Sequence, residues 1–297
     1  MLSVLIPVID WNPYSLVASL AAQLIQCGQS YEILVSDDSD FTESSKISQL
    51  VGQIPGVIYF CRENPLGRSA NRNFLGDQAK HEFLLFMDGD AGMAEGNYIQ
   101  NYLDRLSSDT VLCGGTLYNE EPPENSDFLL RWKYGRSREQ SDAKNRQKRP
   151  WKSFSTFNFL IPAKVFKGIR FDESIKGYGH EDTIFGINLH QSGVKIIHLN
   201  NGLIHLGLEP SSIYLEKIRE SGANLCLLDS RMRFPSKYIG DFSLLASWKR
   251  LKKLKIAWLV AAWFRYRRKS IEKRLCGPDP SLVLLDLYKL GAISHIG

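Results

Sequence analysis

Two carboxylates stand directly after a run of apolar residues in the first third of the chain. Residues 82–90 read Glu-Phe-Leu-Leu-Phe-Met-Asp-Gly-Asp, and the apolar part has the length and composition of a strand buried on both faces. Asp88 and Asp90 would lie at the C-terminal end of this strand, where open α/β sheets bind ligands. Two acids this close repel one another unless a cation joins them, and their oxygens suit Mg²⁺ or Mn²⁺ shared with substrate phosphates. The pattern predicts such a site, and a polar turn is the alternative.

A second acidic pair ends another expected strand. Residues 32–36 are mostly apolar and run into Asp37 and Asp38. Further strands are expected at 3–8 and 57–60, and helices at 13–27 and 67–79. This alternation of strands and helices predicts a parallel, doubly wound sheet whose strand ends meet at one rim. Both acidic pairs are therefore expected in one site.

A third group of polar residues follows a glycine-rich stretch. Two glycines precede Glu181 and Asp182, which open a helix expected over 183–191. Acids in a first helical turn are also favoured by the helix dipole, so this pair has a structural alternative. His205 follows a strand expected at 194–198. A lone histidine near a strand end is often structural, and the two earlier acidic pairs are what favour a ligand role.

The composition is that of a soluble globular protein. The chain has 297 residues, enough for one large α/β domain with an appendage, and apolar and charged residues make up 43% and 23% of it. No apolar stretch reaches about 18 residues and no basic, cleavable leader is seen, so we expect neither a spanning helix nor a signal peptide. Five cysteines at scattered spacing favour reduced thiols in the cytoplasm over a disulfide framework or a zinc site.

Two polar stretches are expected to be loops. Residues 119–127 are rich in acids and proline, and residues 136–150 are polar and basic. The second stretch exceeds the usual length of a loop, which predicts a mobile lid or a partly disordered segment.

Positive charge is concentrated near the C-terminus. Residues 248–274 contain eleven Lys or Arg and one acid, Glu272, whereas the whole chain has a net charge of only +5. The apolar centre of this segment, 256–264, is too short to span a membrane, and the composition predicts an interfacial helix on an anionic bilayer. The aromatic residues form one block and do not alternate with the cations, which disfavours nucleic-acid binding. A helix packed on the rest of the chain is the alternative.

Five short segments occur in the order typical of family 2 glycosyltransferases, and the chain resembles that family over residues 1–208. The segments are Ser3–Val8, Val35–Asp38, Asn64–Asn73, Asp88–Asp90 and Gly179–Asp182. The resemblance implies the GT-A fold and a transfer that inverts the anomeric centre. Residues 177–182 also resemble the galactosyltransferase-type C-terminal half of chondroitin-polymerase-like enzymes. The chain departs from the family at 70–73, where the usual Ala-Arg-Asn run is longer, and at 168–173, on the acceptor side.

The resemblance assigns the nucleotide to the first half of the chain. It implies that Asp38 accepts a hydrogen bond from the uracil N3–H and that Pro7 and Asp10 line the base pocket. Arg68 and Arg72 would face the diphosphate, to which their charge is suited. Pairing of these arginines with the acids at the strand ends is an equal alternative.

The resemblance also implies a metal site. Asp90 would bind Mn²⁺ or Mg²⁺ directly, and Asp88 would touch the ribose or the metal, with Gly89 between them in the nucleotide site. His205 matches the downstream metal ligand of the family. The metal would neutralise the diphosphate leaving group.

Asp182 fits the remaining task, which is to deprotonate the acceptor hydroxyl. An inverting transfer is a single displacement, so one base and one stabilised leaving group suffice. Glu181 would hydrogen-bond the acceptor or the donor sugar. Four aromatic residues are candidates for sugar stacking, with core packing as an equal alternative. They are Trp151, Phe154, Phe157 and Tyr178.

The predicted fold is a single Rossmann-like, mostly parallel α/β sheet flanked by helices. We expect a GT-A domain over residues 1–210, made of a nucleotide-binding half (1–115) and an acceptor and catalytic half (116–210). A helical, basic extension would follow over 211–297.

The predicted activity is a metal-dependent, inverting transfer from a UDP-sugar to a glycan or lipid-linked oligosaccharide, in polysaccharide biosynthesis. The sugar would be a hexose or an N-acetylhexosamine. The enzyme would be cytoplasmic and peripheral on the inner face of the membrane, with no nucleic-acid partner. A sugar nucleotidyltransferase and a non-catalytic nucleotide-sugar-binding module are the alternatives. Nucleotidyltransferases usually carry a glycine-rich phosphate loop after the first strand, where this chain has Ile9–Pro13.

Overall fold

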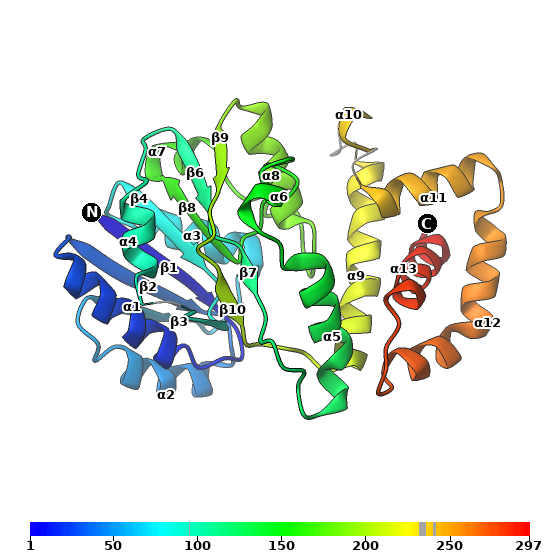
Figure 1. The fold of residues 1–297 in the computed structure, drawn as a ribbon, viewed down its shortest axis with the longest axis horizontal. Helices are drawn as coiled ribbons and strands as arrows, with labels where there is room; N and C mark the ends of the chain where they lie inside the picture. The colour runs from blue at the N-terminus through cyan, green and yellow to red at the C-terminus, as the bar shows by residue number, and fades with distance from the viewer. Residues whose placement is uncertain (95, 232–235, 240–241) are drawn as a thin grey trace. The chain divides into compact units, whose positions relative to one another are not determined.

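The computed structural model describes residues 1–94, 96–231, 236–239 and 242–297, which divide into two compact units (Figure 1). The sheet unit comprises residues 1–119, 140–174 and 181–207. The helical unit comprises residues 120–139, 175–180 and 208–297. The predicted nucleotide-binding half (1–115) and acceptor half (116–210) are divisions by function, and they stay predictions.

The sheet unit is built on a seven-stranded sheet. Its strand order is β3 (Val57–Cys61), β2 (Tyr31–Asp37), β1 (Leu2–Val8), β4 (Phe83–Met87), β8 (Asn158–Pro162), β6 (Thr110–Cys113) and β9 (Lys195–His198). Neighbouring strands are parallel except at β8, which runs antiparallel to both β4 and β6. The mostly parallel α/β sheet flanked by helices is therefore confirmed.

Successive side chains of β1 enter different cores, as the pleat of a strand requires. Val4 and Ile6 pack in one core with helices α1 (Tyr14–Cys27), α2 (Phe41–Val51) and α4 (Tyr98–Leu103). Leu5 packs in the opposite core with α3 (Arg68–Gln78), α7 (Ala163–Gly168) and α8 (Glu181–Gln191). With apolar side chains on both faces, the sheet is covered by helices on both sides (Figure 1).

Helix α1 begins where the sequence indicates. The Asn12 side chain accepts a hydrogen bond from the Tyr14 amide at 3.0 Å, and the helix ends at Gly28, whose φ is +63°. A positive φ is the conformation that glycine adopts most easily at a helix C-terminus. The helices predicted at 13–27 and 67–79 agree with α1 and α3 to within one residue at each end.

A small sheet, which the sequence did not predict, brings a distant segment to the end of β4. Its order is β5 (Ala91–Gly92), β10 (Leu203–His205) and β7 (Thr116–Leu117). In the antiparallel pairing of β10 with β5, His205 lies opposite Ala91. This register places His205 beside the Asp88–Asp90 segment, although more than a hundred residues separate them in sequence.

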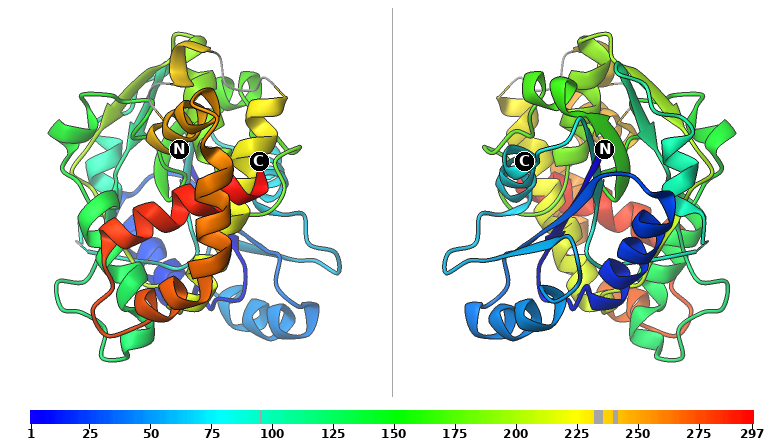
Figure 2. Two further views of the ribbon diagram at one scale, coloured as in Figure 1. Left: turned by 90° about the vertical axis from the view of Figure 1, so that its right-hand side faces the viewer. Right: turned by 90° about the vertical axis from the view of Figure 1, so that its left-hand side faces the viewer.

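The helical unit has a core of its own. It contains α5 (Leu129–Tyr134), the π-helical turn η2 (Gly135–Glu139), α9 (Ser211–Ser230), α10 (Ser236–Ile239), α11 (Ser243–Lys253), α12 (Ala257–Leu275) and α13 (Leu282–Ile296). Figure 2 shows α12, in orange, beside α13, in red. Phe264 and Tyr288 meet there in an edge-to-face contact at 5.1 Å, and a Cβ atom at Gly291 would come within 2.5 Å of Phe264. Only glycine lets the two helices approach this closely.

Two local predictions need correction. The polar stretch 136–150 was expected to be a loop, as a mobile lid or a partly disordered segment, but it forms η2 and the short helix α6 (Ala143–Arg146). The buried Arg146 guanidinium donates to the carbonyls of Gly114 at 3.0 Å and Leu199 at 2.6 Å, which fixes the segment. The basic segment 248–274 is two helices and not one, because the chain turns at Lys255, whose φ is +59°. No helix of the described residues is long and apolar enough to cross a membrane.

Candidate active site

The two acids that end β2 are held differently. Asp37 accepts hydrogen bonds from the Ser39 amide at 2.9 Å, the Ser39 hydroxyl at 2.5 Å and the Tyr59 hydroxyl at 2.6 Å. Asp38 accepts one from the Gly67 amide at 2.8 Å through Oδ2. Its buried Oδ1 has no hydrogen-bond partner among the described residues, and burial raises the pKa of this carboxyl. Asp38 is therefore the acid of this pair with an acceptor atom left for a ligand N–H.

Ser39 connects the loop after β1 to the loop after β2. Its hydroxyl oxygen accepts a hydrogen bond from the Asp10 amide at 2.6 Å and donates to Asp37. Asp10 itself is exposed and has a φ of +50°, which is uncommon for a residue with a side chain. Ser39 was not among the predicted site residues, although it directly follows the acidic pair.

Gly89 is required by the close approach of two strands. A Cβ atom at this position would lie 2.7 Å from the side chain of Val8. The Gly89 amide donates to the Pro7 carbonyl at 3.2 Å. These contacts bring Pro7 to the same edge of the sheet as the acids that follow β4.

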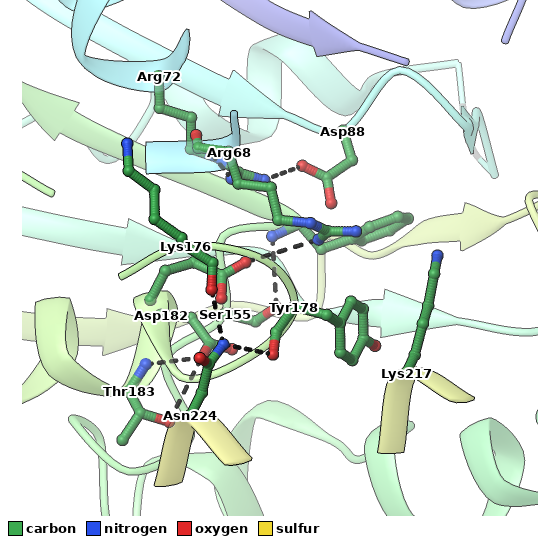
Figure 3. A network of polar contacts seen from close by, with 12 residues as sticks. Arg68, Arg72, Asp88, Ser155, Lys176, Tyr178, Asp182, Thr183, Lys217 and Asn224 are labelled. Carbon is green, nitrogen blue, oxygen red and sulfur yellow. Dashed lines mark hydrogen bonds and ion pairs between the residues drawn. The ribbon is translucent and has the colours of Figure 1, made fainter. Parts of the chain in front are cut away.

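Arg72 is paired with Asp88. Its guanidinium donates to Asp88 Oδ1 at 2.5 Å, and only 3% of the Arg72 side chain is exposed (Figure 3). Burial raises the pKa of Asp88 and the charge of Asp90 adds to this, while the charges of Arg72 and Arg68 oppose it. Arg68 is 39% exposed and lies 3.5 Å from Glu181 Oε1. Arg72 thus pairs with a strand-end acid, and its contact with the diphosphate stays a prediction.

Asp90 and His205 face one another as two ligands of one ion would. His205 Nε2 lies 3.3 Å from Asp90 Oδ2, and the Leu206 amide donates to the Asp90 carbonyl at 3.0 Å. The ring of His205 lies between those of Tyr118 and Phe157, at centroid distances of 5.5 and 5.4 Å. Its Nδ1 is buried without a hydrogen-bond partner among the described residues.

These residues fit a divalent cation that shares its coordination with a substrate. Two ligand atoms at about 2.1 Å from one octahedral ion are separated by roughly 3 Å, close to the observed spacing. Within the described residues, no group of three or more His, Cys, Asp or Glu is arranged to hold a metal alone. Mg²⁺ is usually held by one or two carboxylates together with substrate phosphates, so two protein ligands are sufficient.

Gly207 is a further residue that the sequence analysis missed. A Cβ atom there would lie 2.1 Å from Asp90 Oδ2, so any side chain would displace this carboxylate. The only signal in the sequence is its position two residues after His205.

Asp182 and Glu181 begin helix α8. Asp182 Oδ1 accepts hydrogen bonds from the Thr183 amide at 2.6 Å and the Thr183 hydroxyl at 3.3 Å (Figure 3). Burial, with a further contribution from the charge of Glu181, raises the pKa of Asp182 to about 7. Glu181 Oε2 is buried with no hydrogen-bond partner in the part of the chain that the structure describes. A carboxyl with a pKa near neutrality can accept a proton and release it under physiological conditions.

Residues 176–178, which precede α8, are hydrogen-bonded to α9 within the helical unit. The Asn224 side chain donates to the carbonyls of Lys176 at 2.8 Å and Tyr178 at 3.0 Å (Figure 3). Gly177 has a φ of +74°, and a Cβ atom there would lie 1.9 Å from Glu220. Asn224 was missed because nothing in a helix pattern forty residues later marks it as the partner of this loop.

Asn73 performs a similar task within the sheet unit. Its side chain donates to the Phe171 carbonyl at 3.0 Å and to Glu173 at 2.8 Å, and it accepts from the Phe171 amide at 3.1 Å. It therefore ties helix α3 to the segment 168–173. Asn73 lies inside the run 70–73, where the sequence departs from the usual family pattern, but that run gave no indication of this contact.

The candidate stacking aromatics of the sheet unit pack mainly inside it. Phe154 and Phe157 are 5% and 6% exposed and belong to the two cores. Trp151 stacks on His190 at a centroid distance of 5.8 Å. These contacts support the core alternative for Phe154 and Phe157, whereas a sugar-stacking role for Trp151 and Tyr178 stays a prediction.

Comparison with solved structures gives distant likenesses. A mannosyltransferase from Pyrobaculum calidifontis, solved with GDP-Man and Mn²⁺, is 13% identical with a TM-score of 0.52, over 97% of this chain and 85% of that one. TarS 1–349 from S. aureus, solved in complex with UDP, is 18% identical with a TM-score of 0.49, over 75% of this chain and 65% of that one. This chain therefore spans less than two thirds of TarS 1–349. A search of curated proteins found no match.

The sequence profile described as glycosyl transferase family 2 matches residues 11–170, which is just over half of the chain. The match includes Asp38, Arg72, Asp88 and Asp90 and ends before Asp182 and His205. The mannosyltransferase likeness agrees with a GT-A fold that extends over the rest of the sheet unit. The strand-end acids, the Asp90–His205 contact and the profile lead to one conclusion: this chain belongs to the family 2 glycosyltransferases.

Proposed function

We propose that this glycosyltransferase moves a hexose or N-acetylhexosamine from a UDP-sugar to a glycan or lipid-linked oligosaccharide, with inversion and with Mn²⁺ or Mg²⁺ bound. One observation carries the proposal. Asp88 contacts the cationic guanidinium of Arg72 at 2.5 Å, whereas Asp182, at the start of helix α8, is hydrogen-bonded by the neutral donors of Thr183 and has a pKa of about 7. This division supports separate sites for charge stabilisation and for proton transfer.

The donor would bind along the strand ends. Asp38 Oδ1, the acceptor atom without a partner among the described residues, suits the N3–H of uracil. The partly exposed guanidinium of Arg68 suits the diphosphate. Pro7, Asp10 and Gly89 would line the nucleotide site. Arg72, which is held by Asp88, would fix the position of that acid and contribute positive charge nearby.

Asp90 and His205 would hold the metal, with Asp88 as a further ligand or a contact to the ribose. When bound, the metal would neutralise negative charge that develops on the diphosphate. The rings of Tyr118 and Phe157 would fix the orientation of the His205 imidazole.

Asp182 would act as the general base. As the acceptor hydroxyl oxygen forms its bond to the anomeric carbon, the bond from that carbon to the diphosphate breaks with inversion. The hydroxyl proton moves to the Asp182 carboxylate, and the nucleoside diphosphate leaves with the bonding electron pair. Glu181, which lies 3.5 Å from Arg68, would hydrogen-bond one of the two sugars.

The two other classes fit these observations less well. A sugar nucleotidyltransferase would be expected to have a glycine-rich phosphate loop after β1, where Ile9–Pro13 stand instead. A module that only binds a nucleotide sugar has no use for a carboxyl whose pKa is raised to about 7. We also propose that residues 177–182 belong to a galactosyltransferase-type C-terminal half.

A lipid-linked acceptor would place the enzyme on the inner face of a membrane, as a cytoplasmic, peripheral protein of polysaccharide biosynthesis. The cationic helices α11 and α12 support this location.

A donor screen tests the proposal. The full chain is incubated with a panel of UDP- and GDP-sugars, a mixed oligosaccharide acceptor and Mn²⁺, and release of the nucleoside diphosphate is measured. We expect release from at least one UDP-sugar, its loss with EDTA, and little release by Asp182→Asn. Preference for a GDP-sugar would overturn the assignment of uracil as the nucleobase of the donor. Unchanged release with EDTA would overturn the proposed metal dependence.

A further inference from the structure

Helix α12 has two sides of different character. Phe264, Ile271 and Leu275 are buried in the core of the helical unit. On the other side, Trp258, Trp263 and Tyr266 are 66%, 41% and 85% exposed. Large aromatic side chains gain little by remaining in water, and together they form an exposed patch of the kind that marks a site of interaction.

Exposed cations flank these aromatic residues. Of the eleven Lys and Arg in 248–274, three have a partner: Lys249 pairs with Asp229, Arg268 with Glu272, and Lys252 lies over Trp248. The others make no ion pair within the described residues, and all of them are exposed. They are Arg250, Lys253, Lys255, Arg265, Arg267, Lys269, Lys273 and Arg274.

We propose that the α11–α12 turn and the exposed side of α12 form a docking surface for an anionic lipid bilayer. The surface consists of Leu254, Ile256, Trp258, Leu259, Trp263 and Tyr266 with the eight exposed cations. The cations meet lipid phosphates and carboxylates, and the aromatic and aliphatic side chains enter the headgroup region. The inference rests on the proposed peripheral location and adds the residues that determine it.

Charge and composition favour this occupant over others. A second copy of the chain presenting the same surface would bring two strongly positive patches together, which is unfavourable. In a nucleic-acid site, aromatic residues alternate with cations so that bases can stack, whereas here the apolar run 256–264 contains Trp258 and Trp263 and no cation. A bilayer accepts such a block because the apolar part and the cations reach different depths.

Flotation with vesicles tests the surface. The full chain is mixed with vesicles of phosphatidylcholine alone or with added phosphatidylserine, at low and high salt. We expect binding to the anionic vesicles that is reduced but not lost at high salt. The charge variant Lys253→Glu/Lys255→Glu/Arg267→Glu should bind at least about 100-fold more weakly, since each Lys or Arg near such a surface contributes about 1 kcal/mol. The aromatic variant Trp258→Ala/Trp263→Ala/Tyr266→Ala should lose the salt-resistant part.

Control variants alter side chains of the same kind in the sheet unit, three in the charge control and two in the apolar control. Lys144→Glu/Lys167→Glu/Lys195→Glu changes the net charge equally, and Ile25→Ala/Leu50→Ala removes exposed apolar side chains from the sheet unit. Both controls should bind vesicles like the wild type. The inference is overturned if the wild type does not float with anionic vesicles, if the charge control weakens binding as much as the charge variant, or if single-stranded nucleic acid binds more tightly than vesicles. Nucleotide release in the donor screen is a separate readout, so an active enzyme that does not float contradicts the docking surface alone.

Discussion

The acids that end the strands and the acids that begin α8 differ in the groups that contact their carboxylates. Asp37 accepts three hydrogen bonds, and Asp88 receives the guanidinium of Arg72 at 2.5 Å. Asp182 receives hydrogen bonds from Thr183 and is adjacent to Glu181, whose charge disfavours a second negative charge. Burial and a neighbouring acid raise the pKa of both Asp88 and Asp182. Asp88 has a guanidinium in direct contact that opposes this rise, whereas Asp182 is hydrogen-bonded by the neutral donors of Thr183.

The largest effect expected from this contrast is on transfer itself. Asp182→Asn should lower turnover by about 10²–10⁴-fold, because loss of a general base costs that much. Glu181→Gln, next to it, should have a smaller effect because it removes only a hydrogen bond to a sugar. Steady-state turnover with saturating donor checks both. Asp182 is not the base if its variant keeps more than a tenth of wild-type turnover.

Removal of Arg72 tests how much the Arg72–Asp88 ion pair contributes to stability. Arg72→Met leaves the Asp88 carboxylate near Asp90 without its partner, and we expect the free energy of unfolding to fall by about 3 kcal/mol. Urea denaturation measures this. Arg62→Met is the control, since Arg62 stacks on Phe74 and makes no ion pair within the described residues. Similar stability of both variants would mean that the pair contributes little.

The pH dependence of turnover should reveal the titration of Asp182. Because Asp182 must be deprotonated to accept a proton, turnover should fall about tenfold per pH unit below its pKa of about 7 and level off above it. Turnover measured from acid to mildly alkaline pH checks this. The residual activity of Asp182→Asn should lack the acidic fall. A wild-type profile that is flat across neutrality would contradict the assignment.

The same raised pKa has a consequence for stability. The native state retains the Asp182 proton between about pH 4 and 7 while the unfolded state loses it, so stability falls as pH rises through this range. Asn imitates the protonated acid. The difference in the free energy of unfolding between Asp182→Asn and the wild type should therefore be more favourable to the variant at pH 8 than at pH 5, by on the order of 2 kcal/mol. Urea denaturation at both pH values gives the difference, and an equal offset at the two pH values would contradict it.

The strands and helices around the donor site could be predicted because each is encoded locally. Apolar runs ending in acids gave β2 and β4, and the Asn12–Pro13 signal gave the start of α1. The antiparallel β8 and the small sheet that carries His205 depend on pairing between distant segments. No periodicity in one segment reveals such pairing.

The roles of single polar residues were the hardest part of the site to predict. Both acids of the pair Asp37–Asp38 look equivalent in sequence, and only Tyr59 and Ser39 distinguish them. The prediction of a long loop at 136–150 was wrong for a related reason. In sequence Arg146 is one more cation of a basic stretch, but it is buried against the carbonyls of Gly114 and Leu199.

The affinity for UDP in the presence of Mn²⁺ tests most directly whether Asp90 serves donor binding and Asp182 serves proton transfer. Isothermal titration calorimetry is performed on the wild type, Asp90→Asn and Asp182→Asn, each with Mn²⁺ or with EDTA. We expect that Asp182→Asn binds UDP within about twofold of the wild-type affinity, while Asp90→Asn loses at least about tenfold in affinity and no longer responds to EDTA. Equal UDP affinity for the wild type and Asp90→Asn, or a loss confined to Asp182→Asn, would contradict the separation of donor acids from the base.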